Sequence, residues 1–281
     1  MSNILVNGYE LPGHLSHSAL TTYLQCGHKY YLSRIVKDAE TPAWWFVGGN
    51  AIHTATENFD RMYPTRESLA EGAAAGSDPN FFFDAFVEEM ARVEFDSGDV
   101  DPSAWRVGGR ASKQYPDKED SVWWLDNGPA MFESWVKWRL GSGWHIAEFS
   151  GQPSIEIGFD FTVNDEFAVQ MYLDRLMVNE HGELVIVDLK SGSRTPSSPL
   201  QLAMYAYGCE KILGVRPKWG TFWKARDGVT SQLVDLDTLP SNKVEYIVSG
   251  FDKLRKQGVF LPNLDECGWC GFNEVCEWSK K

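Results

Sequence analysis

The sequence lacks any uninterrupted hydrophobic run of the ~18 residues that a membrane-spanning helix needs. It is nevertheless rich in core-forming side chains, since 43% of its residues are hydrophobic and 14% are aromatic. A chain of 281 residues with this composition can bury a substantial core in one large domain or two small ones. We therefore expect a soluble cytoplasmic protein with no membrane partner.

Positive charge is also scarce. The chain has 26 lysines and arginines against 39 acidic residues, a formal net charge of -13. Phosphate binding usually leaves a basic footprint, so this balance argues against an extended nucleic-acid surface. The deficit is local, however, because residues 66–126 hold 14 acids and 6 bases, a net of -8, which leaves -5 for the remainder. A bound metal would add positive charge at a phosphate, so weak, salt-sensitive DNA binding stays compatible with this composition.

Cysteine is rare, and its number is odd. Three of the five cysteines form the C-x2-C-x5-C pattern Cys267, Cys270 and Cys276, while Cys26 lies far upstream in Leu-Gln-Cys-Gly-His. An odd count without a signal peptide argues for reduced thiols rather than disulfides, and hence for metal ligation. Four thiolates suit tetrahedral zinc as well as an iron-sulfur cluster, and spacing alone does not separate them. Cys209 follows an apolar helical pattern and is interpreted as a core residue.

Two carboxylates occur inside apolar runs. Asp174 interrupts Val-Gln-Met-Tyr-Leu-Asp-Arg, and Asp188 and Lys190 end Leu-Val-Ile-Val-Asp-Leu-Lys. The turn signal Asn-Glu-His-Gly at 179–182 lies between these runs and predicts a hairpin that brings both acids together. Burying an unpaired carboxylate is costly. Two acids beside a lysine therefore indicate either a divalent metal or a structural ion-pair network.

Two further patterns flank the hairpin. Gly49-x-x-x-His53 lies near the start of a helical pattern, and Gln201-x-x-x-Tyr205 has the spacing that puts both side chains on one helix face. The full order is G-x-x-x-H, D, D-x-K and Q-x-x-x-Y. In this order the chain resembles the RecB-like branch of the PD-(D/E)XK nuclease superfamily. Each motif alone is weak, and their succession carries the resemblance.

The resemblance implies an α/β fold with a mixed central β-sheet flanked by helices, the restriction-endonuclease-like core. It implies that Asp174, Asp188, His53 and the main-chain carbonyl of Leu189 bind Mg2+ or Mn2+, which suits oxygen ligands with one imidazole. It further implies that Lys190 orients the attacking water or stabilises charge on the phosphate. His53 could instead be an ordinary helix histidine.

Other residues around these motifs have supporting or alternative roles. The resemblance makes Gln201 and Tyr205 residues that position DNA, although Tyr205 could equally be a core residue. Glu57 is interpreted as a partner of His53. Glu156 is either a further acid near the metal or an ordinary solvent-facing strand residue. Met171 departs from the family pattern, which often has glycine three residues before the first acid.

The cysteines narrow the resemblance. One cysteine before the nuclease motifs and three after them resemble the CRISPR-associated iron-sulfur exonucleases and the nuclease domains of AddAB-type enzymes. This likeness favours a [4Fe-4S] cluster on Cys26, Cys267, Cys270 and Cys276 that clasps the N- and C-termini, with Zn2+ as the alternative. The function implied is a metal-dependent DNA exonuclease that prefers single-stranded or free ends.

Two alternatives remain open. The nuclease could work only inside a complex with proteins of recombination or CRISPR adaptation, or the chain could be a DNA-binding adaptor that has lost catalysis. The intact set of Asp174, Asp188 and Lys190 argues against the second.

We expect a single nuclease domain over 1–281, made of four segments: N-terminal helices with the first cysteine at 1–63, a helical insertion at 64–145, the nuclease core at 146–260 and a cysteine knuckle at 261–281. Helices are predicted after the Ser16 cap, from about Gly49 to Met62, from Ser198 to Leu213 and from Ser241 to Gln257. Alternation predicts a strand over 155–163, and strands are also expected at 219–224 and 229–236. Loops are expected at 73–79 and 108–110.

Overall fold

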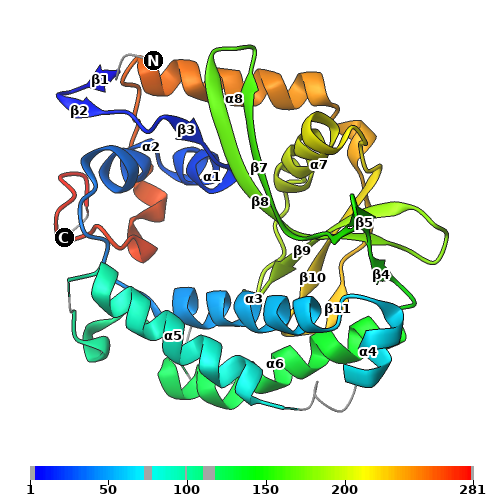
Figure 1. Cartoon of the computed structure of the whole chain (residues 1–281). Coiled ribbons are helices and arrows are strands. Elements are labelled where there is room, and N and C mark those ends of the chain that lie inside the picture. Colours follow the sequence, from blue (N-terminus) through cyan, green and yellow to red (C-terminus); the bar gives the residue numbers. More distant parts are fainter. Residues whose placement is uncertain (1–3, 73–77, 99, 110–117, 280–281) are drawn as a thin grey trace.

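The structure is a computed structural model that describes residues 4–72, 78–98, 100–109 and 118–279. A mixed eight-stranded sheet forms its centre (Figure 1). Its strands are β3 (His14–Leu15), β4 (His145–Ile146), β7 (Ile155–Val163), β8 (Phe167–Val178), β9 (Leu184–Lys190), β10 (Trp219–Lys224), β11 (Val229–Thr230) and β12 (Val234–Asp235). The main order is β11-β10-β9-β8-β3, with β12 on β10 and with β4 and β7 on β8. Two small hairpins lie apart from it, β1 (Leu5–Val6) with β2 (Tyr9–Glu10) and β5 (Glu148–Phe149) with β6 (Gln152–Pro153).

The predicted hairpin is the antiparallel pair β8 and β9. Its turn is closed by Asn179, whose side-chain oxygen accepts hydrogen bonds from the main-chain N–H groups of His181 and Glu183, both 2.9 Å away. Gly182 has a φ of 79°, a conformation that glycine adopts without steric cost. β9 also pairs in parallel with β10. A strand with neighbours on both sides and helices over both faces is almost fully buried, which explains its continuous apolar run.

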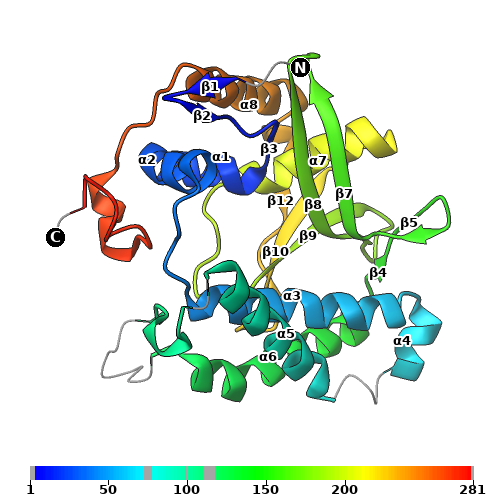
Figure 2. The ribbon, with the colours of Figure 1, turned by 60° about the vertical axis from the view of Figure 1, so that its left-hand side comes forward.

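Helices cover both sides of the sheet (Figures 1 and 2). Three long helices, α3 (Trp44–Met62), α5 (Asn80–Asp96) and α6 (Ser121–Gly141), pack with the short α4 (Arg66–Gly72) on one side. On the other side lie α1 (His17–Gln25), α7 (Leu200–Leu213) and α8 (Ser241–Lys256). Alternate residues of β9 enter the two cores, Val185 and Val187 on the α3 side and Ile186 on the α7 side. Helix α3 and the helices of the segment 64–145 together form the layer that buries one face of the sheet.

Short helical turns complete the described chain. They are α2 (Gly27–Tyr30), a π-helical turn at Tyr31–Val36, and 3-10 turns at Pro102–Ala104, Leu236–Thr238 and Leu264–Trp269.

The two ends of the described chain pack against each other. Tyr23 donates a hydrogen bond to the carbonyl of Val259 at 2.7 Å, and the side-chain amide of Asn263 donates to the carbonyl of Gln25 at 2.8 Å. A Cβ at Gly27 would lie 2.8 Å from the main-chain nitrogen of Leu261, so only glycine permits this approach. Figure 2 shows the red C-terminal segment beside α2.

Most predicted elements are confirmed, with differences at their ends. The second helix begins at Trp44 rather than near Gly49, because its first N–H donates to the carbonyl of Arg106 at 3.0 Å, a tertiary contact that local periodicity does not reveal. The strand expected over 229–236 is divided into β11 and β12. Residues 73–77 and 110 of the two expected loops lie outside the described residues.

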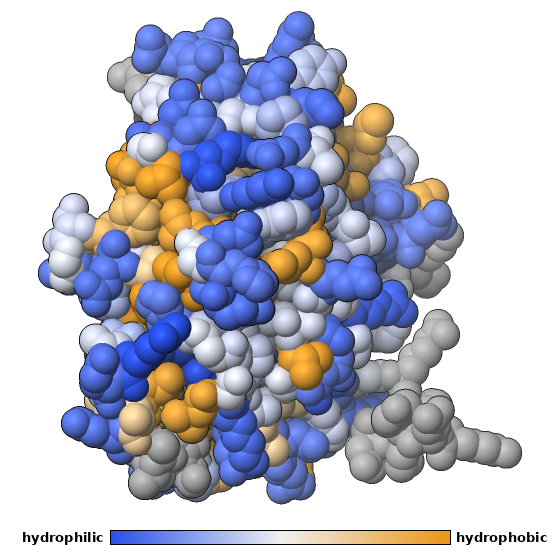
Figure 3. Space-filling view, turned by 90° about the vertical axis from the view of Figure 1, so that its right-hand side faces the viewer, coloured by the Kyte–Doolittle hydropathy of each residue, from blue (hydrophilic) through white to orange (hydrophobic). Residues whose placement is uncertain are grey.

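No helix of the described part has the length and apolar character that a bilayer crossing requires. Hydrophilic residues dominate the face drawn in Figure 3, with hydrophobic residues in patches between them.

Candidate active site

The β8–β9 hairpin brings two predicted acids together. Arg175 pairs with Val187 in the register, so the preceding Asp174 lies next to Asp188. Oδ2 of Asp174 accepts a hydrogen bond from the main-chain N–H of Leu189 at 2.7 Å. Both carboxylates are buried, which fits the apolar runs from which they project.

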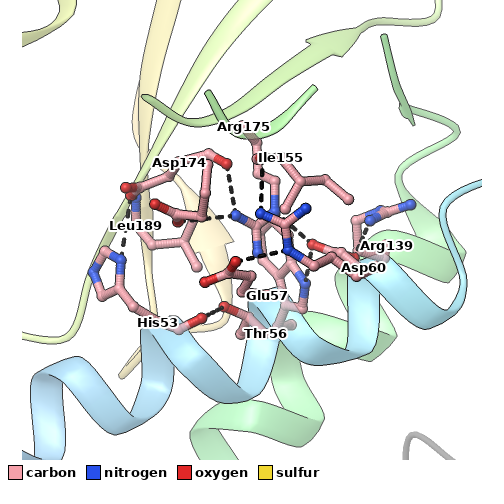
Figure 4. A network of polar contacts seen from close by, with 12 residues as sticks. His53, Thr56, Glu57, Asp60, Arg139, Ile155, Asp174, Arg175 and Leu189 are labelled. Atoms are coloured by element: carbon pink, nitrogen blue, oxygen red, sulfur yellow. Dashed lines mark hydrogen bonds and ion pairs between the residues drawn. The ribbon is translucent and has the colours of Figure 1, made fainter. Parts of the chain in front are cut away.

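His53 reaches this pair from α3. Its Nδ1 atom lies 3.5 Å from Oδ2 of Asp174. Figure 4 shows the His53 ring directed toward Asp174. Gly49 lies one turn earlier, where a Cβ would meet Oγ of Ser191, just after β9, at 2.9 Å. The G-x-x-x-H spacing therefore lets α3 approach the end of β9 while it directs the imidazole at Asp174.

Glu156 is the third acid of the site. The register flanks it with the pairs Ile155–Arg175 and Ile157–Leu173, which places Glu156 opposite Asp174. Its φ is 47°, a left-handed conformation that is uncommon for residues other than glycine. One ligand atom from each of His53, Glu156 and Asp174 lies within 4.8 Å of the others. The alternating pattern of β7 is compatible with either a metal-site acid or a solvent-facing residue at this position. In the structure Glu156 lies beside His53 and Asp174.

Lys190 shares one face of β9 with Asp188, because side chains two residues apart in a strand point the same way. Its Nζ atom lies 2.6 Å from Oδ2 of Asp188. Lys190 thus supplies positive charge beside the buried carboxylate of Asp188.

The acids are poorly stabilised as anions. Burial, opposed by the charge of Lys190 and reinforced by Asp174, raises the pKa of Asp188 to about 6. Burial and the charge of Asp174 raise the pKa of Glu156 to about 7. The pKa of Asp174 is also raised by burial, although the N–H of Leu189 works against this, and burial lowers the pKa of His53, which favours the neutral imidazole. A neutral imidazole and carboxylates that burial disfavours as anions are suitable ligands for a divalent cation, because the cation would offset the cost of their charge.

The predicted Gln201–Tyr205 pair lies on α7 as the spacing indicates. The side-chain amide of Gln201 donates to the Tyr205 hydroxyl at 3.1 Å, and Tyr205 is buried. Burial, with the nearby charges of Asp188 and Asp174, raises the pKa of Tyr205 well above its usual value. The hydroxyl therefore stays protonated beside the acids.

A buried ionic network that belongs to none of the motifs lies next to the site. Asp60 on α3 pairs with Arg139 on α6 and with Nε of Arg175 at 2.7 Å. Arg175 also lies 3.3 Å from Oε1 of Glu156. Glu57, expected to support His53, instead accepts from Nε of Arg61 at 2.7 Å.

The four predicted cluster cysteines line one cavity of about 810 Å³. Sγ of Cys26 accepts from the main-chain N–H groups of Lys29 at 3.4 Å and Asn263 at 3.3 Å, so it lies at the contact between the two ends of the described chain. The other three are Cys267, Cys270 and Cys276. Cys209 is fully buried in α7, as expected, and burial raises its pKa to about 12.

Comparison with known proteins gives one match at the family level. The model of the PD-(D/E)XK nuclease superfamily matches residues 14–277. No curated protein matches the chain. A solved structure described as "Crystal structure of SSO0001" covers 94% of this chain and 96% of its own, with 11% sequence identity and a TM-score of 0.36. A likeness this distant says nothing about the present chain.

Proposed function

The chain belongs to the PD-(D/E)XK nuclease superfamily, and on that premise we propose that it is a Mg2+- or Mn2+-dependent deoxyribonuclease that degrades DNA from free, preferably single-stranded, ends. The observation that carries the proposal is the convergence of Glu156 of β7 and the buried Asp174 and Asp188 of β8 and β9 with His53 of α3 and Lys190. A superfamily match alone would not distinguish an active enzyme from a decayed one.

The residues present fit a divalent cation. His53, Asp174, Asp188 and the carbonyl of Leu189 would hold it, since carboxylate and carbonyl oxygens with one imidazole suit such an ion. When bound, such a cation polarises the phosphate and lowers the pKa of the attacking water. Lys190 would orient that water or stabilise charge on the phosphate oxygens, because its ammonium lies at the rim of the acids.

Gln201 and Tyr205 would act next to this centre. Their hydrogen bond fixes the tyrosine hydroxyl as a donor beside the acids, where it can orient a phosphate oxygen.

The preference for single strands is proposed on the residues that line the cysteine cavity. This cavity extends from Ser191 and Arg194, just after Lys190, to Trp45, Phe46 and Arg106. The guanidinium of Arg106 lies 4.9 Å from the Trp45 ring centre. Aromatic rings and guanidinium groups stack on unpaired bases without sequence preference, which suits a single strand that enters beside the site.

We propose that Cys26, Cys267, Cys270 and Cys276 hold a [4Fe-4S] cluster. They line a common cavity. The resemblance of the cysteine pattern to iron-sulfur nucleases supports the cluster over zinc, which four thiolates would also suit. Reduced thiols fit a cytoplasmic protein. We propose a role with partner proteins in recombination or CRISPR adaptation on the resemblance of the cysteine pattern.

End-labelled linear and circular single-stranded DNA, and blunt duplex, test the proposal with Mg2+, Mn2+ or EDTA. Progressive loss of linear single strands, intact circles and complete inhibition by EDTA are expected. Asp188→Asn should be inactive. The matched control is Asp160→Asn, because Asp160 lies on β7, is exposed and accepts from Gln170 at 2.9 Å outside the site. Cleavage of circles at the rate of linear strands contradicts an exonuclease, and cleavage in EDTA contradicts metal dependence.

A further inference from the structure

Arg175 links the buried carboxylate of Asp60 to two acidic residues of the candidate site. It follows Asp174 on β8, and its side chain is fully buried. Its guanidinium donates through Nε to Asp60 at 2.7 Å and through Nη1 to the main-chain carbonyl of Asp174 at 2.6 Å. The same Nη1 lies 3.3 Å from Oε1 of Glu156. One rigid planar group thus contacts an inner anchor and two acids of the site at once.

The charges of this network do not balance without Glu156. Asp60 serves two guanidinium groups, those of Arg139 and Arg175, with a single carboxylate. Its position is further fixed by the indole N–H of Trp135, 3.1 Å away. The surplus positive charge of Arg175 faces Glu156, whose side chain is 21% exposed. A buried guanidinium requires such a partner, so the network directs one charge toward the site.

The backbone at Glu156 is held away from a relaxed strand. Its φ of 47° interrupts a register that continues unchanged on both sides. A residue in such a conformation persists when its surroundings determine it. Arg175 holds its side chain, and Nη2 of Arg61 lies 3.3 Å from the preceding carbonyl of Ile155.

We propose that Glu156 is an additional acidic ligand of the divalent cation, and that Arg175, anchored by Asp60, is the positioning residue that presents it. The inference rests on the proposed metal-dependent function and assigns two residues to it. Arg175 touches neither substrate nor reacting atoms in this arrangement. It supplies geometry, and its charge balances Glu156 when no cation is bound.

Binding of Mn2+ without DNA, followed by the EPR signal of the free ion, tests this. Glu156→Gln should weaken Mn2+ binding at least tenfold. Arg175→Lys keeps the charge but cannot contact Asp60, Asp174 and Glu156 together, so it should also weaken binding at least tenfold. Combining both changes should weaken binding no more than either alone, because they disturb one contact.

Arg139→Gln is the matched control. It disturbs the same buried network on the far side of Asp60, and within the described ranges no hydrogen bond or ion pair joins Arg139 to Glu156 or Asp174. It should melt earlier but bind Mn2+ like wild type. Wild-type Mn2+ affinity in Arg175→Lys, or equal losses in the Arg139 and Arg175 variants, would overturn the positioning role.

Glu156→Gln keeps the ligand role testable even if Arg175 variants do not fold, since Glu156 is partly exposed. Unchanged Mn2+ affinity in this variant overturns the inference. Wild type that binds Mn2+ with the expected losses but cleaves no DNA contradicts the proposed nuclease and not this inference. If wild type cleaves DNA while Glu156→Gln binds Mn2+ as tightly as wild type, the nuclease proposal stands and this inference is overturned.

Discussion

Lys190 on β9 is in direct register with Lys224 on the parallel strand β10, yet only Lys190 faces a site acid. Lys224 pairs instead with Asp227 in the following turn. The two lysines lie at the same level of neighbouring strands but have different partners. Lys190 pairs with a candidate metal ligand, whereas Lys224 pairs with a surface acid.

This pair gives a controlled test of Lys190. Lys190→Ala should lower DNA cleavage by about 10²–10³-fold, as the loss of one group that stabilises developing charge does elsewhere. Lys224→Ala should cleave normally, since exposed ion pairs contribute little. Initial rates and circular dichroism measured together check this. Equal rates for the two variants would remove Lys190 from the reaction.

The pH dependence of stability follows from the raised pKa values. Folded Asp188 and Glu156 hold protons with pKa values of about 6 and 7, above their ordinary 3.8 and 4.5. The folded state then binds more protons than the unfolded state between about pH 4 and 7. The stability that the protonated acids give the folded state is fully present below this window. It is lost as the pH rises through the window.

Without metal, the melting temperature should therefore fall across that window more in wild type than in an Asp188→Asn, Glu156→Gln double variant. Mn2+ should raise the melting temperature of wild type more at the upper end, because the cation replaces the protons. Calorimetric scans at several pH values measure both effects. A Mn2+ effect that shrinks as the pH rises contradicts the assignment.

The cysteines predict a cluster with a visible signature. Protein purified without oxygen should be brown and should lose its colour when any one of Cys26, Cys267, Cys270 or Cys276 is changed to serine. Cys209→Ala should keep the colour, because Cys209 lies in the core of α7. Iron, sulfide and zinc analysis is the measurement. Colourless protein with one equivalent of zinc would support the alternative metal.

Loss of the cluster and loss of the catalytic metal should have different consequences. A cluster that joins residue 26 to residue 270 closes a long loop, and removing such a tether costs about 5 kcal/mol of stability. Cys270→Ser should therefore melt earlier. Asp174→Asn should lose activity with little loss of stability, or gain some without metal, because burial already disfavours its charge. A Cys270→Ser protein that melts like wild type would show that the cysteines are no structural clasp.

Adjacent glycines on α3 should respond differently to alanine. A Cβ at Gly48 would lie 1.9 Å from the ring of buried Trp124, so Gly48→Ala should destabilise the protein by about 3 kcal/mol or more. At Gly49 the nearest atom is the rotatable hydroxyl of Ser191 at 2.9 Å, so Gly49→Ala should cost less than about 1 kcal/mol. Urea unfolding of both variants decides the order, and a larger loss at Gly49 reverses this interpretation.

The sequence predicted the features that depend on short spacings. The hairpin and the neighbouring positions of Asp174 and Asp188 follow from apolar runs and a turn signal, whereas the approach of His53 to them was implied by the resemblance. The shared face of Gln201 and Tyr205 needs only an interval of four residues. Each of these signals is contained within one or two elements.

The features of the site that the sequence does not predict depend on contacts between distant elements. Alternation left Glu156 undecided because its placement requires a left-handed backbone supported by Arg175 and Arg61. Glu57 was assigned to His53 by helical spacing, but Arg61 lies four residues further along the same helix and competes for it. Asp60 belongs to no motif, and only the three-dimensional meeting of α3, α6 and β8 reveals its role.

The packing of Gly27 against Leu261 has a consequence for the order of synthesis. A ribosome makes Cys26 long before Cys270, while α3 and the β8–β9 hairpin emerge between them. The strands that carry the acids can therefore pair before the last three cysteines exist. On the proposed assignment, assembly of the cluster is the final step of maturation, and a chain cut short before Cys267 would contain the acids but not the complete thiolate set.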